Sequence, residues 1–114
     1  MEMIIHLDND IFDIVKEGKK DIEVRLNDSK RRTLKIGDGL IFLKRPNDDE
    51  EIKAIVTSLD YYADFSSLVN NYDMERLYLD NYTKKEWLKL MRRFYSEEDE
   101  VKWGVVAITF KKIN

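Results

Sequence analysis

The segment from Gly18 to Arg25 contains charged side chains at a spacing that could bring them together on one surface. Apolar residues occupy every second position, Ile22, Val24 and Leu26, and charged residues lie between them, Asp21, Glu23 and Arg25. Lys19 and Lys20 come just before. A period of two is typical of a β-strand, whose successive side chains point to opposite faces. One face of the predicted strand therefore carries two acids and a guanidinium.

Two interpretations fit this charged face. In the first, it is an exposed strand face with cross-strand ion pairs, which stabilise a fold little. In the second, it is the wall of a polar cleft. Lys20 and Arg25 would then contact an anion or a base edge, and Glu23 would orient them or act as an acid or base. The alternation alone favours the first interpretation.

Other residues add candidates for contacts with a nucleic acid. Lys30-Arg31-Arg32 is the most basic tripeptide of the chain, and Lys19, Arg31 and Arg32 are predicted ligand contacts beside Lys20, Glu23 and Arg25. An aromatic ring, from Tyr61, Tyr62 or Trp103, could stack on a base. We select Tyr61 as the aromatic candidate, because core packing is the favoured role of Trp103.

The histidine and cysteine content excludes several kinds of site. His6 is the only histidine, and cysteine is absent, so a zinc site built from Cys and His ligands is excluded. A Ser-His-Asp triad would need His6 itself, which lies in an apolar alternation. A structural role is favoured for His6, with cleft lining as the alternative. We predict neither a metal nor a cofactor.

The composition is that of a folded domain. The 114 residues are 43% hydrophobic and include one proline and four glycines, which predicts one domain over residues 1–114 with a substantial core. No apolar run is long enough to span a membrane. The absence of cysteine fits a reducing cytoplasm, and we expect the protein there.

The net charge of −3 hides an uneven distribution. Residues 16–35 hold eight Lys or Arg against four Asp or Glu, and residues 84–93 hold five against one. Acidic runs occupy residues 48–51 and 97–100. Basic clusters are compatible with nucleic-acid binding even in an acidic protein, although solvated faces are the commoner explanation.

The first half of the chain predicts strands around a short helix. Residues 3–7 form a strand, residues 9–17 a helix that ends at Gly18, and the charged strand follows. A turn at 36–39 precedes an apolar strand at 40–43, which we expect to be buried on both faces. A polar loop at 46–49 leads to a returning strand at 51–59.

The second half predicts mainly helices and a closing strand. Asp64 begins a helix that contains Phe65, Leu68 and Val69, and one short helical turn lies between 72 and 79. Thr83 and Glu86 form a capping box for a helix through Phe94, whose apolar stripe is expected to pack on the sheet. A buried strand runs from 103 to 110. Short, closely spaced strands favour an α+β fold with a small mixed β-barrel.

Three blocks of this sequence together resemble the ASCH (activating signal cointegrator homology) domain. They are Gly18-Lys19-Lys20 with Ile22-Glu23-Val24-Arg25, then Ile36-Gly37-Asp38, then Phe94-Tyr95-Ser96-Glu97-Glu98 followed by Trp103-Gly104-Val105. The resemblance covers nearly the whole chain and is typical of small stand-alone prokaryotic members. It implies a PUA-like mixed β-barrel with flanking helices, and a cleft beside residues 20–25 for RNA, a nucleoside or a nucleotide. It thereby favours the cleft interpretation.

One bacterial branch of the family resembles an amidohydrolase that removes the acetyl group from N4-acetylcytidine. Its working residues are a lysine and a threonine in the block that corresponds to residues 20–23, and a glutamate before the last helix. Lys20 matches the lysine, but Glu23 stands where the branch has its threonine, and the glutamate's place falls near Asp80. A threonine hydroxyl can be a nucleophile, whereas a carboxylate there could only be a general base or an ion-pair partner.

Three functions follow from these observations. The first is RNA or nucleotide binding in a charged cleft. The alternative is an amidohydrolase acting on a modified nucleoside, with Lys20, Glu23 and Asp80 as catalytic residues and Arg25 steadying an oxyanion. The third is a protein-binding adaptor that uses the acidic run at 97–100, which is more often a solvated loop. A closed pocket would favour the enzyme, and an open basic groove would favour RNA.

Overall fold

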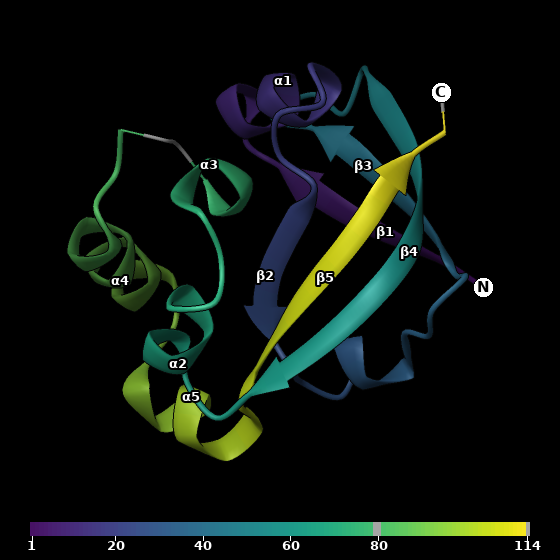
Figure 1. The fold of residues 1–114 in the computed structure, drawn as a ribbon. Coiled ribbons are helices and arrows are strands. Elements are labelled where there is room, and N and C mark those ends of the chain that lie inside the picture. The colour runs from purple at the N-terminus through teal and green to yellow at the C-terminus, as the bar shows by residue number, and fades with distance from the viewer. Residues whose placement is uncertain (79–80, 114) are drawn as a thin grey trace.

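A computed structural model describes residues 1–78 and 81–113. Figure 1 shows a curled sheet with a group of helices on one side. The strands are β1 (Glu2–Leu7), β2 (Ile22–Leu26), β3 (Gly39–Lys44), β4 (Glu51–Tyr62) and β5 (Val105–Lys112). The helices are α1 (Asn9–Lys16), the 3-10 helix η1 (Arg31–Thr33), α2 (Phe65–Val69), α3 (Met74–Leu77), α4 (Lys84–Phe94) and α5 (Glu97–Trp103).

The sheet is mixed and is open between its two edges. Its strand order is β1-β3-β4-β5-β2, with β1 parallel to β3 and the other pairs antiparallel. Strands β1 and β2 are thus the edges of a curled sheet that forms a half-barrel. The α+β class and the mixed, barrel-like sheet are as predicted.

Two apolar clusters hold the fold together. The first lies between the curled sheet and α1 and includes Ile5, Phe12 and Phe42. The second packs the opposite face of β2 and β5 on α2, α3 and α4, and includes Ile22, Leu68 and Trp87. Burial of such side chains is the main favourable contribution to folding.

The predicted helix signals are present in the structure. The Asp64 side chain accepts a hydrogen bond from the Ser67 backbone nitrogen at the start of α2. Thr83 and Glu86 form both bonds of the capping box at α4. Gly18 follows α1 with a φ of +81°, a left-handed conformation that glycine adopts without a steric penalty.

Four local predictions were wrong. Residues 97–103 form helix α5 instead of a loop and the start of a strand, because Ser96 caps them by accepting a bond from the Asp99 nitrogen. Strand β4 extends to Tyr62. Strand β3 is buried on one face only, since Ile41 and Leu43 are partly exposed. The stripe of α4 is buried less than expected: within α4 only Trp87 is buried, in the cluster shared with β2 and β5, and α4 also packs beside α2.

No helix among the described ranges 1–78 and 81–113 is long and apolar enough to cross a bilayer.

Candidate functional site

A cavity of about 240 Å³ lies at the open side of the half-barrel. Its lining comes from the end of β1, the start of α1, the strand β2, and the helices α3 and α4. Most of the α4 stripe therefore lines this cavity. The charged segment predicted from the sequence supplies Lys20, Glu23 and Arg25 to the same cavity.

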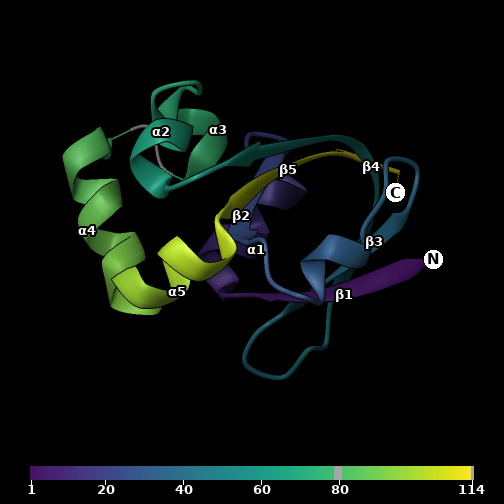
Figure 2. The same cartoon turned by 90° about the horizontal axis from the view of Figure 1, so that it is seen from below.

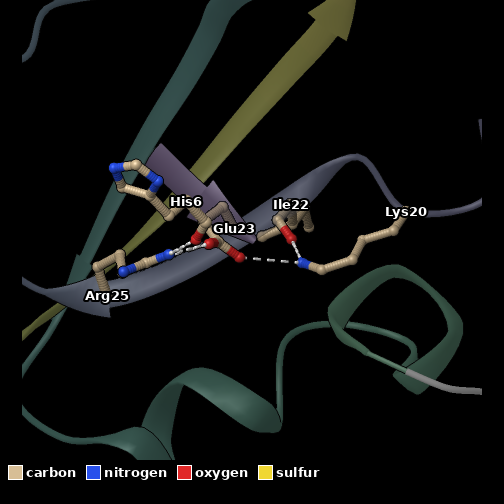
Figure 3. Close-up of polar contacts among 5 residues, drawn as sticks. All are labelled: His6, Lys20, Ile22, Glu23 and Arg25. Atoms are coloured by element: carbon tan, nitrogen blue, oxygen red, sulfur yellow. Dashed lines mark hydrogen bonds and ion pairs between the residues drawn. The ribbon is translucent and has the colours of Figure 1, made fainter. Parts of the chain in front are cut away.

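Lys20 is a buried cation at the floor of the cavity. Only 3% of the residue is exposed. The turn after Gly18 brings it in front of β2, where its Nζ donates to the Ile22 carbonyl oxygen and lies 3.4 Å from Oε1 of Glu23 (Figure 3). A buried ammonium needs such partners, because the loss of its hydration is costly.

Glu23 lies between Lys20 and Arg25 (Figure 3). Its Oε2 accepts from Nε of Arg25 at 3.0 Å and from Nη2 at 2.7 Å. The Nη2 atom also donates to the His6 carbonyl oxygen at 3.3 Å. Arg25 thus connects β2 to β1, the two edges that the sheet leaves apart.

The register of β2 explains why this charged face is buried. Glu23 lies opposite Ile108 and Arg25 opposite Val106, and directly opposed residues of an antiparallel pair share a face. Val106 and Ile108 belong to the cluster under the curled sheet. The charged face therefore points to the barrel side of β2, and the face of Ile22, Val24 and Leu26 is buried under the helices. The interpretation as an exposed ion-paired face was wrong.

Burial and ion pairing set the protonation of the three residues. Burial would raise the pKa of Glu23, but the charges and hydrogen bonds of Arg25 and Lys20 outweigh it and lower that pKa below 4.5. Burial lowers the pKa of Lys20 despite the opposing charge of Glu23. The pKa of Arg25 is raised, because Glu23 and Tyr95 outweigh the effect of burial.

The directions of these pKa shifts bear on which group could accept a proton. A carboxylate with a lowered pKa is a poor general base near neutral pH, and one oxygen of Glu23 already accepts two bonds from Arg25. Lys20 has the opposite tendency, since a lowered pKa makes its neutral amine easier to form. Glu23 is suited to holding the two cations, and burial makes the neutral amine of Lys20 easier to form than that of an exposed lysine.

An aromatic and aliphatic wall stands above the charged floor. Its residues are Ile11, Leu77, Tyr78, Trp87, Leu90, Met91, Phe94 and Tyr95. Phe94 is 63% exposed at the rim, so the cavity is open to solvent there. None of these residues was predicted from the sequence to belong to the site. For Trp87, Leu90, Met91 and Phe94 the signal was the apolar stripe of the helix at 84–94, which was attributed to packing on the sheet.

Tyr95 joins this wall to the charged floor. Its ring stacks on Phe65 with centroids 5.4 Å apart, and its hydroxyl interacts with Arg25. Burial raises the pKa of the Tyr95 hydroxyl, so the group stays protonated near neutral pH and can donate a hydrogen bond. Tyr95 was not among the predicted site residues.

The other predicted residues lie outside this cavity, with one exception. Lys19 is exposed and pairs with Glu17 at 3.4 Å. Tyr61 is 56% exposed on β4 and does not line the cavity, and neither do Arg31 and Arg32. His6 does line it. Asp80 lies outside the described residues.

His6 has two separate contacts. Its carbonyl oxygen holds Arg25, and its ring Nδ1 lies 3.2 Å from Oδ1 of Asp48 in the loop between β3 and β4. His6 therefore has a structural role and also lines the cavity. Within residues 1–78 and 81–113, no group of three or more His, Cys, Asp or Glu could hold a metal ion.

The chain matches one family model and several solved structures. The family model of the ASCH domain matches residues 5–114. No curated protein matches the chain. The crystal structure of the hypothetical protein PH0355 is 34% identical, with a TM-score of 0.87, over 99% of this chain and 100% of that one. The solution structure of PF0455 from Pyrococcus furiosus is 32% identical, with a TM-score of 0.78, over 100% and 99%.

A more distant structure shares the fold. The crystal structure of the ASCH protein from Zymomonas mobilis is 16% identical, with a TM-score of 0.66, over 99% of this chain and 73% of that one. The curled five-stranded sheet with its helices is thus the PUA-like fold of ASCH proteins, as the resemblance of the sequence implied. With the family model matched over almost its whole length, this chain belongs to the ASCH domain family.

Proposed function

We propose that the cavity binds one unpaired nucleoside unit of RNA. The observation that carries the proposal is the combination, in one cavity of about 240 Å³, of a charged floor and an aromatic wall. Pockets for drug-sized ligands measure about 300–1,000 Å³, so this one suits a ligand no larger than a nucleoside. Bases in single strands are recognised by stacking on aromatic rings and by hydrogen bonds to their edges.

The floor offers both the hydrogen-bond acceptors and the hydrogen-bond donors that a base edge needs. Oε2 of Glu23 is occupied by Arg25, whereas the contact of Oε1 within the described part of the chain is the 3.4 Å one with Lys20. Oε1 can therefore accept a hydrogen bond from a ligand N–H group. Lys20, Arg25 and the Tyr95 hydroxyl are donors beside it.

The experiment is a calorimetric titration with the four ribonucleosides and with a single-stranded RNA of mixed sequence. Leu90→Trp fills the cavity from its wall without changing any charge. Val101→Trp makes a matched addition on α5, at a residue that is 80% exposed and does not line the cavity. We expect the Leu90 variant to lose binding at least ten-fold and the Val101 variant to keep it. Equal binding by both variants would refute the cavity as the site.

A second candidate function is hydrolysis of an amide on a modified nucleoside. The specific observation is that burial lowers the pKa of Lys20 at the cavity floor. The neutral amine of Lys20 would take a proton from water as the hydroxide adds to the amide carbonyl carbon. The same proton would then pass to the leaving nitrogen as the C–N bond breaks. Asp80 stays a proposed catalytic residue beside Lys20 and Glu23.

Incubation with N4-acetylcytidine tests this candidate, with cytidine followed by chromatography. The candidate predicts turnover that Lys20→Ala abolishes and Lys19→Ala leaves unchanged, because Lys19 is exposed and lies outside the cavity. Absence of turnover by the unsubstituted protein would remove hydrolysis of this substrate and would leave the binding proposal intact.

A further inference from the structure

Cations surround an aromatic ring at the end of the sheet where β5 begins. The guanidinium of Arg32 in η1 lies 5.3 Å from the ring centroid of Trp103, and Nζ of Lys102 lies 4.9 Å from it. Arg32 is held there by its Nε, which donates to the Asn27 carbonyl oxygen at 2.8 Å. In Figure 2, η1 and α5 are both seen at this end of the molecule. Arg32 is exposed, so this ordered guanidinium is accessible to a ligand.

This cationic surface is connected by a backbone hydrogen bond to the end of the strand that lines the cavity. The Asn27 nitrogen donates to the Gly104 carbonyl oxygen at 3.0 Å, which joins the end of β2 to the residue after Trp103. Asn27 comes directly after the end of β2, two positions beyond Arg25. The charges of Arg25 and Arg31 both act on the hydroxyl of Tyr95, which lines the cavity. Arg31 therefore lies near Tyr95, and it directly precedes Arg32 in η1.

Arg31 has unused capacity for hydrogen bonding. Its Nε is buried and has no hydrogen-bond partner among residues 1–78 and 81–113, which is uncommon for a polar atom inside a native structure. Its backbone nitrogen is held by Asp28, so the start of its side chain is fixed. A small turn of the guanidinium toward an oxyanion would give it the bonds it lacks.

We propose that Arg31, Arg32, Lys102 and Trp103 bind the nucleotide next to the one in the cavity, so that the ligand is a single strand of RNA and not a free nucleoside. This inference rests on the proposed function of the cavity. Arg31 and Lys102 contact phosphate oxygens, and a base stacks on the plane of Arg32 against Trp103. Bases stack on guanidinium planes as well as on aromatic rings.

The charge pattern around this surface sets the direction of the strand. Glu97, Glu98 and Asp99 occupy the first turn of α5, and carboxylates there repel phosphates. The strand therefore leaves the cavity over η1 and the last turn of α5. It does not continue along α5.

The test compares a hexaribonucleotide of mixed sequence with the ribonucleoside that the cavity binds most tightly, at two salt concentrations. The variant is Arg31→Gln/Lys102→Gln. The control, Lys111→Gln/Lys112→Gln, removes the same charge at the opposite end of β5. We expect the first pair to weaken hexamer binding at least ten-fold and to leave nucleoside binding unchanged. The log–log salt slope should become less steep by about 1.4, since each phosphate contact to a single strand contributes about 0.7.

Each other outcome has a definite meaning. Equal hexamer affinity in the two double variants overturns the inference. If the unsubstituted protein binds the hexamer no more tightly than the nucleoside, the inference is also overturned. The proposed function of the cavity is then left standing. Absence of binding to both ligands overturns the two together. Thermal unfolding by circular dichroism confirms that each variant is folded, and Trp103→Leu should reduce hexamer binding without altering nucleoside binding.

Discussion

At the scale of single residues, Glu23 is the centre of the site. It is the buried carboxylate that both Lys20 and Arg25 contact. Buried charges are tolerated when they are paired and hydrogen-bonded, and removal of one partner leaves the others uncompensated. The pairing therefore holds two cations in a cavity where neither would be stable alone.

Glu23→Gln should destabilise the protein strongly. The substitution keeps the shape of the side chain but leaves Lys20 and Arg25 buried without their counter-charge, so we expect a loss of about 3–5 kcal/mol in the free energy of unfolding. Denaturant titration measures it. Glu50→Gln is the control, because it breaks exposed ion pairs with Lys16 and Lys44 and should change stability little. A variant of Glu23 as stable as this control would contradict the account.

The same residue predicts a dependence of stability on pH. The folded pKa of Glu23 lies below its ordinary value of 4.5, so its contribution is fully present above pH 4.5 and is lost as the pH falls through the folded pKa. The pKa values of Asp64 and Glu86 are lowered by hydrogen bonds at helix starts. These two residues therefore also make the protein less stable as the pH falls.

Unfolding free energies measured between pH 2 and pH 6 should fall toward acid in the unsubstituted protein and less steeply in Glu23→Gln. The difference isolates Glu23, because Asp64 and Glu86 are present in both proteins. Parallel curves would mean that the carboxyl of Glu23 titrates alike in the folded and unfolded states.

At the scale of elements, α4 forms one wall of the cavity. Trp87 anchors it in the second apolar cluster, with its ring 5.9 Å from that of Phe65. Nη2 of Arg92 lies 2.6 Å from Oε1 of the buried Glu100, whose Oε2 accepts from the Phe65 nitrogen at 2.7 Å. Glu100 thus ties α2, α4 and α5 together, a structural role for one residue of the acidic run.

Removal of the cap of α4 should loosen this wall. Thr83→Ala deletes the side chain that accepts from the Glu86 nitrogen at 3.1 Å, and loss of such a cap costs about 0.5–2 kcal/mol. We expect reduced stability by thermal unfolding and weaker RNA binding by calorimetry. Ser96→Ala, which removes the cap of α5 instead, should lower stability similarly and leave binding closer to normal. Greater loss of binding in the Ser96 variant would argue against α4 as the wall.

Local sequence signals predicted the elements well where one signal dominated. The capping box at Thr83, the cap at Asp64 and the stop at Gly18 act through neighbouring backbone groups, so the sequence is enough to find them. The acidic run at 97–100 was harder, because helix α5 depends on Ser96 and on the burial of Glu100 against α2. That contact joins residues 35 positions apart.

At the scale of the whole molecule, the sheet's open side makes the site. Alternation at residues 21–26 predicted the strand, but it could not show that both faces of β2 are buried. That fact depends on pairing with β5 and on the helices beyond. The same limit applies to Phe94 and Leu90, whose helical spacing is equally compatible with a core and with a cavity wall.

Charge is arranged unevenly over the molecule in a way that fits the proposal. The chain is acidic overall, with a net charge of −3, yet Lys20 and Arg25 lie in the cavity, and Arg32 and Lys102 meet at Trp103 outside it, with Arg31 next to Arg32 in η1. Basic clusters of this kind attract phosphates even when the rest of the surface repels them.

The most direct test of the central claim is the map of backbone amide chemical shifts during titration with single-stranded RNA. We expect the largest changes around the cavity, at residues 23–25 of β2, at residues 90–94 of α4 and at Tyr95, and we expect them to extend to residues 31–32 and 102–104. Tyr61 and the end of β5 at Lys111 should show little change. Changes concentrated around Tyr61, or none at any RNA concentration, would contradict the assignment of this cavity as the RNA site.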